Sequence, residues 1–301
     1  MIELGRLFTA MVTPMRPDES VDVDQAKRLA RALLETGSDG LVVCGTTGEA
    51  STLEFEEERL LFRELLPVVR EHGAALVAGT GSNSTRTAID SSVRAERIGV
   101  DALLLVVPYY NKPSQEGLYR HFQAVAASVR IPCILYNVPS RTGTNMTADT
   151  QLRLAAIPNI VGTKEASGDL DQIGRIIAGA PEGFRVWSGN DGDNLPILSI
   201  GGYGVVSVVS HLAGRQVRGC IDAAVRGDLA EAGRIHRRLM PLVKAMFIDG
   251  NPVPLKYALN HVGFPVGPAR PPLVEPDEAT AAKIRAAVAA AQIDLPVSVS
   301  P

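Results

Sequence analysis

Eight short apolar segments, rich in β-branched residues, recur along the chain about 20–36 residues apart, and they constrain the fold more than any other feature. Stretches with helical periodicity separate them, for example residues 23–37 and 54–73. Segments that are apolar at nearly every position are typical of a parallel sheet covered by helices. Eight such units match a closed (β/α)8 TIM barrel, which we therefore predict. The predicted strands lie in "LFTAMVTP", "DGLVVCG", "AALVAGTG", "DALLLVVPYY", "PCILYNVP", "NIVGTKEAS", "FRVWSGND" and "GVVSVVSHL".

The competing architecture is an open, doubly wound sheet that binds a dinucleotide. The first predicted strand is not followed by the G-x-G-x-x-G motif of that fold. The segment "GTGSNS" (79–84) lacks the third glycine and follows the third strand, so we interpret it as a turn. The barrel remains the better prediction.

The last part of the chain reads as helical from about Gly214 through "AAKIRAAVAAAQ", which is more helix than one barrel unit needs. We therefore expect residues 1–213 to form the barrel strands and most of its helices. Residues 214–301 are expected to form the last barrel helix and a C-terminal helical extension. Earlier in the chain, Ser51 and Glu54 fit an S-x-x-E capping box, which predicts a helix start directly after them.

The composition is that of a globular protein, with 46% hydrophobic and 21% charged residues among 301. A net charge of -3 and the absence of Lys/Arg runs argue against partners such as nucleic acid or anionic lipid. No apolar run approaches the ~20 residues of a membrane span. Glu3 and Arg6 interrupt the N-terminal stretch where a signal peptide would be apolar. We therefore expect a cytoplasmic protein.

The three cysteines, Cys44, Cys133 and Cys220, lie far apart and form no C-x-x-C pair. Their odd number and spacing argue against a disulfide framework and against a zinc site. We interpret them as small core residues in a reducing environment.

Polar residues are concentrated directly after the predicted strands, at the end of a barrel where active sites are built. Parallel strands point their carboxyl ends to the same rim, so these residues are expected to converge on one pocket. They lie in Thr13-Pro14, "GTTGE" (45–49), "PYYNK" (108–112), "YNVPSRTG" (136–143), Lys164-Glu165 and "SGND" (188–191).

The segment "GTTGEAST" (45–52) could bind a small anion such as a carboxylate, because glycines, two hydroxyls and a helix start come together there. Taken alone, an ordinary capped turn is the favoured interpretation. Arg141 is a loop guanidinium that could be a solvated charge or a bidentate carboxylate clamp. Tyr136 could be a core tyrosine or could turn its hydroxyl to the pocket. Of the adjacent Tyr109 and Tyr110, at most one can face the pocket on extended backbone.

Lys164 ends an apolar strand in "NIVGTKEASG". Apolar neighbours favour the neutral amine, which is a nucleophile toward a ketone or aldehyde and can form a Schiff base. The alternative is a strand-end lysine that reaches outward to water. Tyr136, from the neighbouring strand, could shuttle the proton needed to lose water. The residues alone leave both interpretations open.

The same residues strongly resemble the dihydrodipicolinate synthase family, within the superfamily of pyruvate-dependent, Schiff-base aldolases with (β/α)8 barrels. The resemblance covers nearly the whole chain, and the combination of motifs is specific although no single motif is. It rests on "GRLFTAMVTP", "GTTGEASTL", "PYYNKPSQEGLYRHF", "YNVPSRTG", "GTKEASGD", "SGND", "NPVPLKYAL" and "RPPL".

The resemblance implies that Lys164 forms a Schiff base with pyruvate, and that no metal or organic cofactor is needed. It implies a hydroxyl proton relay formed by Thr46, Tyr136 and Tyr110, with the equivalent of Tyr110 supplied by the partner subunit across a tight dimer. The family is usually a homotetramer, built as a dimer of such dimers.

The remaining site residues bind substrate in the family. Thr47, with its backbone amide, matches the site for the pyruvate carboxylate, and Arg141 matches the residue that holds the carboxylate of aspartate semialdehyde. Gly189 and Val206 match positions of the pocket wall near the lysine. The reaction implied is the condensation of these two substrates to 4-hydroxy-tetrahydrodipicolinate in lysine biosynthesis.

Two other functions are weighed against this one. Sister enzymes that cleave sugar acids, such as N-acetylneuraminate lyase and 2-keto-3-deoxygluconate aldolase, share the lysine and the tyrosine. A guanidinium at Arg141 fits an amino-acid carboxylate better than a row of sugar hydroxyls, which favours the synthase. A non-catalytic barrel would be expected to have lost part of the Lys/Tyr/Thr set, all of which is present.

The chain departs from the family at the site where lysine inhibits some members. Phe55, Glu58 and Thr87 stand where those members carry histidines and a glutamate, although Asn83 and Tyr109 are retained. The loss of the carboxylate that would pair with an incoming ammonium predicts little or no feedback inhibition by lysine.

Overall fold

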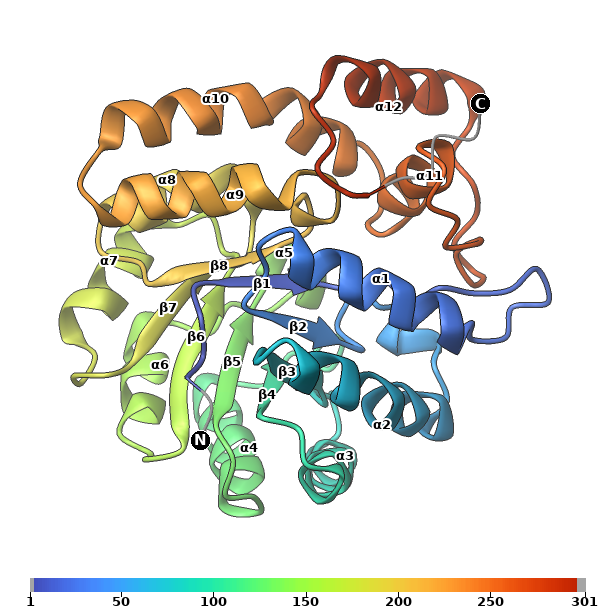
Figure 1. Ribbon diagram of the computed structural model, residues 1–301. Coiled ribbons are helices and arrows are strands. Elements are labelled where there is room, and N and C mark those ends of the chain that lie inside the picture. Colours follow the sequence, from blue (N-terminus) through green and yellow to red (C-terminus); the bar gives the residue numbers. More distant parts are fainter. Residues whose placement is uncertain (1–2, 297–301) are drawn as a thin grey trace.

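The computed structural model describes residues 3–296, and its eight parallel strands close into a barrel in chain order (Figure 1). The predicted TIM barrel is confirmed, and each predicted apolar segment contains one strand. The ends of the two predicted regions, residues 1–2 and 297–301, lie outside the described residues. The strands are β1 (Leu7–Ala10), β2 (Gly40–Val43), β3 (Ala75–Gly79), β4 (Ala102–Val106), β5 (Cys133–Asn137), β6 (Ile160–Glu165), β7 (Arg185–Ser188) and β8 (Gly204–Ser207).

Helices surround the barrel and continue beyond it. Those that accompany the strands are α1 (Val23–Glu35), α2 (Phe55–Glu71), α3 (Thr85–Ile98), α4 (Gln115–Ala127), α5 (Pro139–Thr142), α6 (Ala148–Ala155), α7 (Leu170–Gly179), α8 (Asn194–Ser199) and α9 (Ser210–Val225), with the 3-10 turns η1 (Ala50–Thr52) and η2 (Asp191–Asp193). The predicted helical extension is present as α10 (Leu229–Met246), α11 (Val253–His261) and α12 (Glu278–Ala290). Of the helices in residues 3–296, none combines the length and the apolar composition that crossing a bilayer requires.

The interior of the barrel is a packed cluster of side chains from alternate strand positions, as expected for this fold. Phe8 and Trp187 meet edge to face, with ring centroids 6.2 Å apart. The same cluster contains Tyr136 and Val206. The three cysteines are buried and free, which confirms them as core residues.

The α-helix that follows β2 starts directly after Glu54, as predicted, but the predicted capping box of Ser51 and Glu54 is wrong. Residues 50–52 form the short turn η1, and α2 starts at Phe55 with Glu54 as its N-cap residue. The reciprocal contact is made by Glu57, whose carboxylate accepts from the Glu54 backbone N–H at 2.8 Å. Glu54 thus takes the place of a Ser or Thr cap. The acidic first turn also complements the helix dipole. No α-helix start lies directly at "GTTGE", so a helix dipole does not support anion binding there.

The helical extension folds back over the end of the barrel that bears the β1 and β2 loops (Figure 1). The Met15 N–H donates to the Val266 carbonyl at 3.0 Å. At Gly267, which has φ +70°, a Cβ would lie 1.8 Å from the Met15 carbonyl oxygen. Only glycine allows the two backbones to approach this closely. The Arg270 guanidinium also donates to both carboxylate oxygens of Glu57, each at 2.8 Å.

Candidate active site

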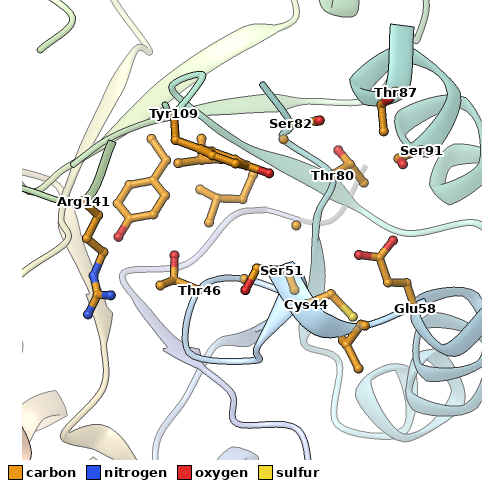
Figure 2. A pocket seen from close by; sticks show the side chains of 18 of the residues that line it. Cys44, Thr46, Ser51, Glu58, Thr80, Ser82, Thr87, Ser91, Tyr109 and Arg141 are labelled. Atoms are coloured by element: carbon orange, nitrogen blue, oxygen red, sulfur yellow. The ribbon is translucent and has the colours of Figure 1, made fainter. Parts of the chain in front are cut away.

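A cavity of about 470 Å³ opens at the carboxyl ends of β2 to β5. Its walls come from the loops that follow these strands, as the polar strand ends predicted. At one end lie Thr46 and Arg141, and at the other lies Glu58 with Thr80 and Ser91 (Figure 2). The cavity therefore has one end at the predicted catalytic residues and a second, hydroxyl-rich end at helices α2 and α3.

Lys164 is almost completely buried, at 5% exposure, near the end of β6. The parallel register of β5 and β6 places it directly beside Tyr136. Its Nζ lies 4.1 Å from the centre of the Tyr136 ring, and Tyr136 itself lines the cavity. No carboxylate of residues 3–296 lies within ion-pair distance of this amine. The alternative of a lysine that reaches outward to water is therefore wrong.

Gly189 lies against the Lys164 side chain, and Val206 lies in the barrel interior. A Cβ at Gly189 would lie 2.9 Å from Cγ and 3.0 Å from Cε of Lys164, so any larger residue would push the lysine aside. Val206 lies at 2% exposure in the same interior cluster as Tyr136. Lys164 itself is not among the residues that line the cavity, whereas its neighbour Tyr136 is.

The strand end that carries Lys164 is fixed by its neighbour Glu165, which is fully buried. Adjacent strand residues point to opposite faces, so Glu165 lies outside the barrel wall. Its carboxylate accepts from Asn137 Nδ2 at 2.9 Å, from Gln151 Nε2 at 2.5 Å and from the Ser167 hydroxyl at 2.7 Å. These bonds tie β6 to β5 and to α6. Sequence reasoning did not assign this role to Glu165, because its partners are spread over some thirty residues.

The two threonines of the β2 loop differ in position. Thr46 lines the cavity, and Figure 2 shows it between Arg141 and Ser51. Thr47 is buried at 3% exposure and is not among the residues that line the cavity. Its hydroxyl oxygen accepts from Asn251 Nδ2 at 2.9 Å. The loop therefore presents one hydroxyl to the cavity and holds the second against the extension.

Two residues of the extension were missed by sequence reasoning, Asn251 and Lys256. Lys256 is 1% exposed, and its Nζ pairs with Glu49 Oε1 at 2.5 Å. Burial lowers the pKa of Lys256, and the charge of Glu49 partly opposes this effect. The only sequence signal was the segment "NPVPLKYAL", which contains both residues.

Arg141 lies on the short helix α5 at the mouth of the cavity, where it is exposed. Within residues 3–296, no carboxylate lies close enough to pair with its guanidinium. An unpaired guanidinium at a cavity mouth can take a carboxylate in a bidentate arrangement.

Of the adjacent tyrosines, only Tyr109 lines the cavity, which confirms that the two cannot both face it. Tyr110 is 89% exposed and adopts φ +75°. The structure of the single chain therefore does not bring Tyr110 together with Thr46 and Tyr136. This left-handed conformation is uncommon for a bulky residue.

The far end of the cavity contains Glu58, which projects from α2 toward the Thr80 side of the cavity (Figure 2). Burial raises the pKa of Glu58 to about 7. Phe55, Thr87 and Tyr109 line the same cavity. The residues that depart from the family pattern thus share a cavity with Thr46 and Tyr136.

The arrangement supports carbonyl chemistry. A buried amine with no counter-ion, a phenol beside it and a hydroxyl in the cavity provide a nucleophile and proton carriers. Within residues 3–296, no three His, Cys, Asp or Glu side chains are grouped so that they could hold a metal ion.

Comparison with known proteins agrees with this chemistry. The family model of the dihydrodipicolinate synthetase family matches residues 3–291. The chain is 55% identical to a 4-hydroxy-tetrahydrodipicolinate synthase of Dehalococcoides mccartyi, over 99% of this chain and 100% of that protein. It is 53% identical to the synthase of Symbiobacterium thermophilum, over 97% and 100%.

Solved structures give the same result. The dihydrodipicolinate synthase of Cyanidioschyzon merolae, solved with lysine bound, has a TM-score of 0.94 and 46% identity, covering 95% of this chain and 98% of that one. The synthase of Acinetobacter baumannii, complexed with pyruvate, has a TM-score of 0.93 and 38% identity, covering 96% and 99%. A family model that matches residues 3–291, relatives more than half identical over nearly the whole chain, and solved structures with the same fold lead to one conclusion: the chain belongs to the dihydrodipicolinate synthase family.

Proposed function

We propose that this chain condenses pyruvate with L-aspartate 4-semialdehyde to give 4-hydroxy-tetrahydrodipicolinate, through a Schiff base on Lys164. The observation that carries the proposal is the buried Lys164 amine against the Tyr136 ring, without a carboxylate partner among the described residues. The names of the relatives support the same reaction.

The chemistry follows from the amine. Lys164 attacks the ketone of pyruvate, and loss of water gives an iminium. The positive nitrogen acidifies the methyl group, which loses a proton to give an enamine. The enamine carbon attacks the aldehyde, and the substrate's own amine then displaces Lys164 to close the ring. Thr46 and Tyr136 would carry the protons, together with Tyr110 of the partner subunit.

The two substrate carboxylates have separate binding residues in this proposal. Thr47 and its backbone amide would hold the carboxylate of pyruvate. Arg141, at the mouth, would hold the carboxylate of the aldehyde, and its guanidinium distinguishes this acceptor from a sugar acid. Replacement of Arg141 by alanine should raise the KM for the aldehyde much more than the KM for pyruvate.

The role of Tyr110 implies a tight dimer, and we propose a homotetramer in the cytoplasm. An aromatic ring that is 89% exposed on a left-handed backbone gains little from its own subunit, which supports a role in a partner. Light scattering after size exclusion tests the oligomer directly. A monomer with full activity would contradict it.

Borohydride reduction in the presence of pyruvate, read by peptide mass spectrometry, tests the Schiff base. The adduct is expected on the peptide that contains Lys164. The matched control is internal: Lys256 is also buried but is paired with Glu49, and its peptide should stay unmodified. Absence of the adduct from the Lys164 peptide would refute the proposal. Turnover of N-acetylneuraminate or 2-keto-3-deoxygluconate, with none of aspartate semialdehyde, would favour the sugar-acid alternative.

A further inference from the structure

We propose that Asn251, supplied by the C-terminal extension, is a positioning residue that orients the Thr47 hydroxyl toward the carboxylate of the keto acid. The inference rests on the proposed function, in which Thr47 contacts that carboxylate. Asn251 itself would act through Thr47 and would not touch substrate.

The contact between the two residues determines which way the hydroxyl points. Asn251 Nδ2 donates to Thr47 Oγ1 at 2.9 Å, and both residues are buried, at 7% and 3% exposure. A hydroxyl has one proton to donate. Because the Thr47 oxygen accepts from the amide, its proton is left for another acceptor, and an anionic ligand is the strongest acceptor this loop could meet.

The carbonyl oxygen of the Asn251 side chain indicates a functional role rather than a packing role. Its Oδ1 is buried and has no hydrogen-bond partner in residues 3–296. A buried carbonyl without a partner destabilises the fold, and such groups need an explanation. An apolar residue of similar size would avoid this penalty, so the amide is retained for the bond that it makes to Thr47.

The loop and the extension are held together independently of Asn251. Glu49, in a left-handed conformation with φ 60°, accepts from Lys256 Nζ at 2.5 Å and from the Arg270 backbone N–H at 2.7 Å. Lys256 also donates to the Pro268 carbonyl at 2.7 Å. The buried ion pair and these bonds fix the position of the loop. Removal of the Asn251 amide should therefore change the direction of one hydroxyl and leave the loop in place.

The first test is kinetic. Asn251→Ala is expected to raise the KM for pyruvate roughly five- to tenfold, the usual loss for one charge-assisted hydrogen bond. The KM for aspartate semialdehyde and kcat should change less than about twofold, since neither Arg141 nor Lys164 is affected. Asn251→Asp keeps the shape of the side chain but replaces its N–H donor by an oxygen acceptor. The Thr47 hydroxyl should then donate to this aspartate, and the added negative charge should repel the carboxylate of pyruvate. This variant should raise the KM for pyruvate by more than about tenfold.

The matched control is Asn260→Ala. Asn260, also in the extension, bonds only to backbone, with its Nδ2 donating to the Gly267 carbonyl at 3.0 Å and its Oδ1 accepting from the Val266 N–H at 2.7 Å. Its loss should lower the melting temperature without separating the two KM values. A variant of Asn251 that behaves like this control would overturn the inference.

A double-mutant cycle with Thr47→Val makes the test independent of folding effects. In the Thr47→Val background, Asn251→Ala should leave the KM for pyruvate unchanged. Equal increases in both backgrounds would overturn the inference.

Borohydride trapping separates this outcome from failure of the proposed function. Trapping of the wild type at Lys164, with the same pyruvate dependence in Asn251→Ala, refutes the positioning role alone. No trapping in the wild type refutes both.

Discussion

Replacement of Glu58 by glutamine should stabilise the protein at alkaline pH and leave its stability unchanged in acid. Burial beside the cavity raises the pKa of Glu58 from its usual 4.5 to about 7. Ionisation in the fold is therefore less favourable than in the unfolded chain by about 3 kcal/mol, at roughly 1.4 kcal/mol for each pKa unit. Glu58 is only half-buried, so solvent screens part of this effect, and we expect about 1–3 kcal/mol.

The direction in which stability changes with pH follows from proton binding. Between about pH 4.5 and 7 the folded state holds a proton on Glu58 that the unfolded chain has lost. Stability therefore falls as the pH rises through this window, and the whole penalty is present above pH 7. Glutamine has the same shape and never ionises, so it removes the penalty.

Urea titrations at about pH 4.5 and pH 8.5 measure the effect. The midpoint of Glu58→Gln should match that of the wild type in acid and exceed it in alkali. Glu56→Gln is the matched control, because the Glu56 side chain lies on the same helix but is 74% exposed and pairs with Arg59. An equal shift of the Glu58→Gln midpoint at both pH values would refute the reasoning.

Three further outcomes are expected. Gly189→Ala should lower kcat/KM and the rate of borohydride trapping at least about tenfold, because its Cβ would lie 2.9 Å from Lys164 Cγ; Gly192→Ala, whose Cβ meets nothing within 3.6 Å, should not. Tyr110→Phe should reduce kcat by roughly a hundredfold and leave pyruvate binding unchanged, and equal loss in both would indicate a structural role. L-Lysine should inhibit weakly or not at all in a steady-state titration, and Thr87→Glu should increase its effect; strong inhibition of the wild type would contradict the reading of this site.

The sequence was sufficient for the fold because each buried strand is apolar on both faces, which only a helix-covered parallel sheet can accommodate. Only one of the two adjacent tyrosines lines the cavity, as predicted, but strand alternation is not the cause, because both lie beyond the end of β4 and Tyr110 has φ +75°. The helix start after β2 was predicted at the right place, but its capping residues were not, because Ser51-x-x-Glu54 and Glu54-x-x-Glu57 overlap and the structure uses the second. Local patterns cannot choose between two overlapping caps.

The side-chain pairings inside the site could not be fixed from local sequence patterns, for a different reason. The pairing of Tyr136 with Lys164 depends on the register of β5 and β6, and a bulge near Cys133 shifts that register. The pairing of Glu49 with Lys256 joins two segments far apart in the chain, one before and one after nearly the whole barrel. Such contacts follow from closure of the barrel. The sequence around either residue of a pair does not indicate which residue it will contact.

The extension holds the β2 loop in place, and it is synthesised after the whole barrel. A ribosome completes β8 at Ser207 before it reaches Asn251. A nascent chain at that stage carries every residue that, in the proposed function, would meet either substrate, yet its β2 loop still lacks the hydrogen bond from Asn251 to Thr47. If the proposed roles of Thr47 and Asn251 hold, full activity requires the last helices, and a prematurely terminated chain would keep the Lys164 amine but bind the keto acid weakly.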